Sequence, residues 1–214
     1  MSGFMRMKGL AATFGVGTTK AANTGGDYVN MRYVDVFADP HATSTNAASC
    51  HLLGSAGAGQ LLTTGITTPT VFTNPDFPRN LTVWADGACT SAITITGTNQ
   101  FDAAISEAIS CNGAAIVSGT KVFKTITGVS CAAYSAGAQT VYIGVGSILG
   151  TSRIMNGLSI DGAVYTTASG ASTAVQETTR PVKAPTAAVY GVTFATALSA
   201  SVTYLVAYGS SEVR

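Results

Sequence analysis

Charged side chains are scarce in this sequence. Of its 214 residues, 11 are Lys or Arg and 10 are Asp or Glu, which makes 10% of the chain, against about 25% in an ordinary soluble domain. Its basic residues are clustered no more densely than the pairs Arg6 with Lys8 and Lys121 with Lys124. Binding to a nucleic-acid backbone requires several clustered basic groups that displace counterions. We therefore expect no nucleic-acid partner.

The formal net charge is only +1, so copies of the chain repel each other weakly. The cores of protein interfaces are likewise depleted in Lys, Glu and Asp. Both properties favour a protein whose surface is largely covered by neighbours in its working state. A neutral Thr/Ser/Ala/Gly surface that is merely tolerated, as in extracellular β proteins, is the alternative.

Long apolar runs are absent as well. No segment approaches the roughly 20 apolar residues that a membrane-spanning helix requires. The N-terminal sequence MSGFMRMKGLAATFGVG contains a basic pair but no apolar run of the length found in signal peptides. We expect a protein that folds in the cytoplasm and has no membrane partner.

Closely spaced cysteine pairs are also missing. Cys89, Cys111 and Cys131 are separated by 22 and 20 residues, and without a CxxC pair a zinc ribbon or knuckle is disfavoured. The interpretation we favour is that these residues are buried thiols acting as small hydrophobic side chains. The sequence leaves open whether they form disulfides.

Histidine occurs only twice. The two histidines belong to a short segment that also contains a cysteine and an aspartate: Asp39, His41, Cys50 and His51. Imidazole and thiolate are suitable ligands for zinc or copper, so these residues are candidates for a metal site. Neighbouring residues on a strand point to opposite faces, however, so Cys50 and His51 would not share one ion. We predict a loop beside a core strand and no metal site.

Motifs that would support catalysis are incomplete. Ser135 lies in AYSAG, which is similar to a GxSxG nucleophile elbow, but no helix follows it. Gly144, Gly146 and Gly150 are near a GxGxxG pattern, again without a helix. We therefore predict no catalytic residue and no cofactor, and we assign these glycines to a strand end where backbone passes close to backbone.

Two carboxylates about 5 to 10 Å apart could cleave a glycosidic bond. Asp102 and Glu107 differ in strand parity and would face opposite ways. Asp86 and Asp102 could form such a catalytic pair only if the fold brings their carboxylates together. Asn80-Leu81-Thr82 matches a glycosylation sequon, which we interpret as a chance match.

Short alternating strands are what the sequence does contain. Residues 78–150 form a train of apolar-alternating runs closed by Gly, Asn or Asp, which predicts an antiparallel meander. Leu81, Val83 and Ala85 should share one apolar face of their strand. Ile93 and Ile95 should share an apolar face of the next strand. Asn112-Gly113 predicts a type I′ hairpin that folds 114–117 back on the preceding strand. A single strand is expected at 121–129 and another at 140–145, in which Val141, Ile143 and Val145 share a face.

The flanking segments complete the prediction. Residues 1–27 form an extended arm, and 28–77 an N-terminal β segment that begins with a strand at 28–37. The main β domain is 78–214, in which 151–214 supplies completing strands; the alternative is one continuous domain from 28. Turns are expected at Asn156-Gly157 and Asp161-Gly162, a surface loop at 166–185, and strands at 187–197 and 201–208. Trp84 should fill the core or the space between sheets.

Residues 78–150 resemble β-rich structural proteins found among the virion components of tailed bacteriophages, which are described as capsid decoration or head-associated proteins. The resemblance is carried by the order of the segments PRNLTV, ITITGTN, ISEAI, NG, VSGTKVFKTITGV and TVYIGVGSILG. The resemblance covers residues 78–150 and rests on strand order and turn spacing. The sequence departs from the usual pattern by carrying Cys89, Cys111 and Cys131 inside this block.

The sequence thus predicts an all-β fold, an antiparallel sandwich or jelly-roll-like barrel with an extended N-terminal arm. The resemblance implies a non-enzymatic protein of the virion, assembled in the host cytoplasm, that decorates or cements the capsid. Its partners would be the major capsid protein or other shell proteins, and its own copies, with a trimer favoured over a dimer. A tail or fibre module that binds a host glycan through Tyr134, Tyr142 and Tyr165 is the first alternative, and a glycosidase is the second.

Overall fold

The computed structural model describes residues 31–46, 49–50, 52, 60–61, 72–131, 139–153, 160–167, 175–176, 191–194 and 197–210. This part of the chain contains twelve β-strands and no α-helix. The all-β class predicted from the sequence is therefore confirmed, and the antiparallel strands form curled, sandwich-like layers. The predicted arm at 1–27 lies outside the described residues.

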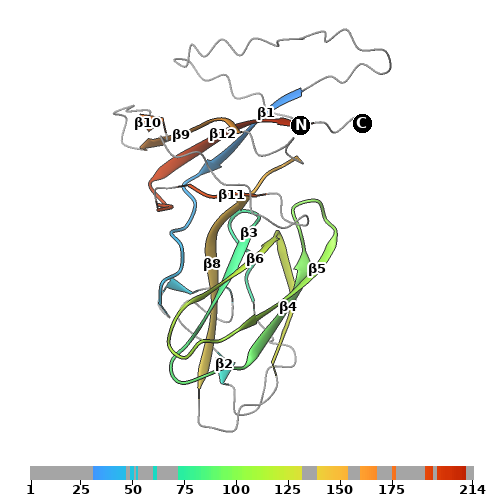
Figure 1. Cartoon of the computed structure of the whole chain (residues 1–214), viewed down its shortest axis with the longest axis vertical. Helices are drawn as coiled ribbons and strands as arrows, with labels where there is room; N and C mark the ends of the chain where they lie inside the picture. Colours follow the sequence, from blue (N-terminus) through green and yellow to red (C-terminus); the bar gives the residue numbers. More distant parts are fainter. Residues whose placement is uncertain are drawn as a thin grey trace.

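The strands form three antiparallel sheets (Figure 1). Sheet I has the order β1 (Met31–Ala38), β12 (Val202–Ser210), β9 (Ile160–Thr167) and β10 (Val175–Gln176). Sheet II has the order β11 (Gly191–Val192), β8 (Thr140–Gly150), β3 (Arg79–Ala85) and β6 (Val117–Phe123), and β2 (Gln60–Leu61) also pairs with β8. Sheet III consists of β5 (Ala104–Ser110), β4 (Ala92–Thr98) and β7 (Thr125–Ser130).

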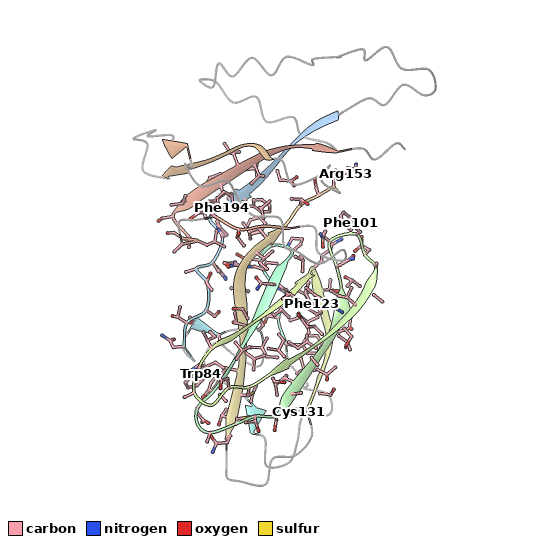
Figure 2. The ribbon with its side chains drawn as sticks, in the orientation of Figure 1. Trp84, Phe101, Phe123, Cys131, Arg153 and Phe194 are labelled. Atoms are coloured by element: carbon pink, nitrogen blue, oxygen red, sulfur yellow. The ribbon has the colours of Figure 1, made fainter. Side chains whose placement is uncertain are left out.

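The larger hydrophobic core lies between sheets II and III, where Phe123 sits in Figure 2. Strand alternation explains it, because every second residue of a strand points to the same face. Leu81, Val83 and Ala85 on β3 and the isoleucines of β4 are completely buried, as predicted from the sequence. On β8 the predicted set Val141, Ile143 and Val145 is also buried.

A second core joins sheet I to the far end of β8. Phe37 on β1 meets Phe77 with ring centroids 5.6 Å apart, and Phe194 meets Tyr204 on β12 at 4.7 Å. Figure 2 places Phe194 between sheet I and the upper end of β8. The Tyr204 hydroxyl donates to the Ala197 carbonyl at 3.0 Å, so this buried aromatic keeps its polar atom bonded.

Several local predictions are wrong. Residues 114–117 do not form a hairpin with β5, because β6 pairs with β3 in the opposite sheet. Only Gly113 of the Asn112-Gly113 pair has a positive φ, at 55°, and its N–H donates to the Cys89 carbonyl at 2.8 Å. A type I′ turn needs two positive φ angles. Isolated bridges around Asn112 are the only pairing there.

The expected strand at 121–129 is interrupted at Lys124. Phe123 ends β6 in sheet II and Thr125 begins β7 in sheet III, so the chain crosses between sheets at this residue. The crossing lets Val122 and Phe123 before Lys124, and Ile126 and Val129 after it, all be buried. A single continuous strand in one sheet would not bury all of them. The third error concerns Asp161-Gly162, which is part of β9 and lies at a register shift against β12 where a turn was predicted.

The prediction of a loop at 166–185 is wrong at the end of β9 and at the two-residue strand β10, which both lie in this range. Within the predicted strand at 187–197, Gly191 and Val192 form β11, but residues 193, 194 and 197 are not in a strand, so the prediction is wrong there. The predicted strand at 201–208 corresponds to β12. The strand expected at 28–37 corresponds to β1. Asn156-Gly157 lies outside the described residues.

Candidate functional site

The most concentrated group of potentially reactive side chains is a thiol cluster formed by Cys89, Cys111 and Cys131 around Ser91. Cys111 continues β5, and its N–H donates to the Ser91 carbonyl at 2.9 Å. Cys131 follows β7 and lies at the end of the sandwich away from sheet I (Figure 2). The three cysteines are 1%, 5% and 9% exposed respectively, so the cluster is closed to solvent.

All four cysteines are present as thiols, and none is in a disulfide. Burial raises the pKa of the Cys111 thiol to about 12, and the neighbouring Cys89 adds to this shift. Burial also raises the pKa of Cys131, although a hydrogen bond with Ser91 partly opposes it. Burial raises the pKa of the Cys50 thiol to about 11. Nucleophilic cysteines require a lowered pKa, which is the opposite of the direction found for Cys50, Cys111 and Cys131. Together with the burial of all four cysteines, this favours the interpretation made from the sequence, that they act as small hydrophobic side chains.

A second buried polar group is the arginine clasp, which comprises Arg79, Asp76, His41 and Gly146. The Arg79 side chain is fully buried. Its Nε and Nη2 both donate to the Gly146 carbonyl, with the Nε bond at 2.9 Å. Nη1 donates to the His41 carbonyl at 2.9 Å and lies 3.1 Å from Asp76 Oδ1. Burial lowers the pKa of Arg79, while Asp76 opposes that shift.

The arginine clasp connects three distant segments. Asp76 Oδ2 accepts the His41 N–H at 2.7 Å, so the carboxylate holds both the guanidinium and the segment that follows β1. Gly146 belongs to the middle of β8, and Arg79 begins β3. Every guanidinium nitrogen has a protein acceptor, which is the arrangement expected for a structural buried cation.

Asn80 and Ser44 extend this buried polar layer. Asn80 donates from Nδ2 to the Gly119 carbonyl at 2.7 Å and accepts the Ile148 N–H at 2.8 Å. Ser44 accepts the Val145 N–H at 3.0 Å through Oγ. Asn80 is 2% exposed. The amide of the Asn80-Leu81-Thr82 sequon is therefore occupied and inaccessible to a glycosyl donor.

The glycines of β8 explain why these side chains fit. A Cβ on Gly144 would lie 2.2 Å from Ser44 Oγ, and one on Gly146 would lie 2.2 Å from Asn80 Oδ1. A Cβ on Gly150 would lie 2.6 Å from Val122 Cγ1 and 3.1 Å from the Pro78 carbonyl oxygen. The glycines therefore make room mainly for side chains, where the sequence predicted a close approach of backbone to backbone. No helix begins after them within the described residues.

The candidate carboxylates do not form a catalytic pair. Asp86 accepts the Thr140 N–H at 2.7 Å after β3, whereas Asp102 pairs with Lys124 Nζ at 2.7 Å in the turn between β4 and β5. These places are at opposite ends of the sandwich, as the neighbouring labels Trp84 and Phe101 show in Figure 2. Glu107 Oε1 accepts the Thr120 N–H at 2.7 Å, joining β5 to β6. The three carboxylates therefore bind backbone or a lysine.

The residues considered as metal ligands, for which the sequence predicted no site, differ in their exposure to solvent. His41 is exposed while Cys50 is 2% exposed, and His51 lies outside the described residues. Across the described ranges, no group of three or more His, Cys, Asp or Glu side chains could hold a metal ion. Ser135 lies outside these ranges.

The aromatic candidates are only partly brought together. Trp84 and Tyr142 lie on neighbouring strands with ring centroids 5.1 Å apart and planes tilted by 57°. Both are half-buried on the face of sheet II opposite the core of Leu81 and Val83. Trp84 is thus at the surface of the sandwich and not between its sheets. Tyr134 lies outside the described residues, and the Tyr165 backbone pairs with Tyr204 in sheet I.

Sequence reasoning missed the arginine clasp and Asn80. The available signal was the pair Arg79-Asn80 at the start of an otherwise apolar strand, because buried polar residues in such a position need specific partners.

Within the described part of the chain there is no helix of the length and hydropathy needed to cross a membrane. Comparison with family models, curated proteins and solved structures found no match for this chain.

Proposed function

We propose that this chain is a non-enzymatic structural protein of a tailed-phage virion, where it decorates or cements the capsid as a homo-oligomer. The observation that carries the proposal is the use of its polar groups. Arg79, Asn80, Asp86 and Glu107 all bond to main-chain atoms of other strands, so the side chains that could do chemistry instead rigidify a β body. The resemblance of residues 78–150 to decoration proteins supports the same role.

The mechanism follows from rigidity and low charge. Two hydrophobic cores and the arginine clasp hold three sheets in fixed positions, so the protein loses little conformational entropy on docking. A net charge of +1 imposes little repulsion between crowded copies on a shell. A decoration protein of this kind stabilises a shell by bridging neighbouring shell subunits.

The test is co-sedimentation with empty shells made from the corresponding major capsid protein. The proposal predicts saturable binding at fixed lattice positions and a higher temperature of shell disruption when the protein is bound. An unrelated small β protein of similar charge serves as the control. Absence of both binding and shell stabilisation would contradict the proposal.

A glycan-binding tail or fibre module is the second candidate, and one observation favours it. Trp84 and Tyr142 form a half-buried aromatic pair at the surface, and such rings can stack against the apolar face of a sugar. A glycan array with wild-type protein and with Trp84→Ala tests this function. It requires hits with the wild type that disappear in the variant.

A further inference from the structure

The β4–β5 hairpin carries two cysteines just beyond its open end, on the face that points to the core. The Cys111 N–H donates to the Ser91 carbonyl at 2.9 Å, and the Gly113 N–H donates to the Cys89 carbonyl at 2.8 Å. These bonds continue the antiparallel register of β4 with β5, so Cys89, Ser91 and Cys111 share one face. Cys89 is 1% and Cys111 is 5% exposed, so both thiols lie inside the sandwich.

The two thiols are in contact with each other. The Cys111 side chain is hydrogen-bonded to the side chain of Cys89. Cys131 is hydrogen-bonded to a serine, Ser91. A disulfide forms without distortion only where the fold already brings its two cysteines together. The fold therefore holds Cys89 and Cys111 ready to be joined.

Distance along the chain does not favour this pair. Cys89 and Cys111 are 22 residues apart, and Cys111 and Cys131 are 20 residues apart. The entropy of closing a loop changes only slowly with loop length, so an unfolded chain forms these two pairs about equally. A strong preference for the Cys89–Cys111 pair would thus report the folded arrangement of the hairpin, and the Cys111–Cys131 pair is an internal control.

We propose that Cys89 and Cys111 form a disulfide when the chain folds, or opens locally and recloses, in the presence of a small-molecule disulfide such as oxidised glutathione. A thiolate of the pair attacks this disulfide and expels one small thiolate, which leaves a mixed disulfide. The other cysteine then attacks the protein sulfur and expels the second small thiolate. In total the two protein thiols lose two protons and two electrons, and the small disulfide is reduced to two thiols.

Burial decides when this exchange takes place. Thiol–disulfide exchange needs a thiolate, and burial raises the pKa of the Cys111 thiol to about 12 in the closed cluster. Exchange therefore proceeds in molecules in which this end of the hairpin is open. Once that end has closed, the same burial separates the disulfide from reductants in solution.

The disulfide ties the hairpin at the end opposite its turn. The loop from Cys89 to Cys111 contains all of β4 and β5, so closing it removes conformational freedom from the unfolded chain. The thiols of the structure are the reduced state, which is the state that a protein keeps in the cytoplasm. The occasion for oxidation rests on the proposed function, because a virion leaves the reducing cytoplasm, but the chemistry of the pair does not.

The experiment is refolding of the reduced full chain from urea into a buffer of reduced and oxidised glutathione, followed by acid quenching and non-reducing peptide mapping. The Cys89–Cys111 peptide should exceed the Cys111–Cys131 peptide at least about tenfold, because folding raises the effective concentration of the first pair. In the same buffer with concentrated urea, the two peptides should agree within about twofold. Similar amounts of both peptides in refolded protein, a predominance of any other pair, or refolded protein without a disulfide would each overturn the inference.

Two further measurements concern the folded product. The oxidised protein should keep its disulfide in dithiothreitol until urea is added, and its urea midpoint should lie above that of the reduced protein. Cys131→Ala, or Cys131→Ser if that variant does not fold, should form the disulfide like the wild type. Reduction without urea, or a midpoint below that of the reduced protein, would contradict the proposal. Shell co-sedimentation with fully reduced protein tests the proposed function separately, so either can fail alone.

Discussion

Removing the carboxylate of Asp76 should destabilise the protein far more than removing an exposed carboxylate. In Asp76→Ala, the fully buried Arg79 guanidinium loses its only counter-charge within the described residues, 3.1 Å away. The His41 N–H also loses its acceptor at 2.7 Å. The remaining bonds to the Gly146 and His41 carbonyls satisfy donors but do not neutralise the charge.

The magnitude follows from burial. Breaking a buried ion pair by removing one partner costs about 3 to 5 kcal/mol. The Asp76 side chain keeps 15% of its surface exposed, so water partly screens the pair and the lower end applies. We expect a loss of about 3 kcal/mol in the free energy of unfolding, equivalent to a fall in Tm of about 6 to 12 °C for a chain of this size.

Urea unfolding of a double-mutant cycle measures this effect. Arg79→Met removes the charge and keeps much of the volume, so Asp76→Ala with Arg79→Met should be no less stable than Asp76→Ala alone. Asp86→Ala is the control, and losing its exposed hydrogen bond should cost about 1 kcal/mol. The reasoning is refuted if Asp76→Ala costs no more than Asp86→Ala, or if the costs of the two single substitutions simply add.

Three further predictions concern the thiols and glycines. In native protein, Cys50, Cys89, Cys111 and Cys131 should react with a thiol reagent only after unfolding; rapid native reaction would disprove the closed cluster. Because folding raises the pKa values of Cys50, Cys111 and Cys131, the unfolding free energy should fall from about pH 9 upward, by at most about 1.4 kcal/mol per pH unit for each of these thiols, and Cys111→Ala should remove the share of this slope that comes from Cys111. Gly97→Ala would place a Cβ 1.9 Å from the Thr125 carbonyl oxygen, so it should lower the free energy of unfolding by about 3 kcal/mol. Gly113 has open space around it and a φ of 55°, so Gly113→Ala should lower this free energy by only about 1 kcal/mol. Urea unfolding measures both changes.

Side-chain alternation was sufficient to predict the buried faces of individual strands. Leu81 with Val83 and Ile93 with Ile95 are buried as expected because parity is a local property. The choice of sheet is not local. Asn112-Gly113 carries a strong turn signal, yet β6 pairs with β3, since burying Val122 and Phe123 in sheet II outweighs a hairpin contact with the exposed Ala114 and Ala115.

The arginine clasp was beyond sequence reasoning for a similar reason. Two of the partners of Arg79, His41 and Gly146, are 38 and 67 residues away. A single cation at the start of a strand predicts exposure unless those distant carbonyls are known to converge on it. The separation of Asp86 from Asp102 likewise depends on strand direction across two sheets, which no local spacing encodes.

Sheet I makes the first and last described strands neighbours, since Met31 of β1 lies opposite Ser210 of β12. A growing polypeptide cannot close this ladder until β12 has left the ribosome, so β1 must wait until the residues between Ala38 and Val202 have been synthesised. Contacts of such long sequence separation slow folding and leave an unpaired edge open to aggregation in the meantime. Expression yield should therefore depend strongly on temperature and on chaperone capacity during synthesis.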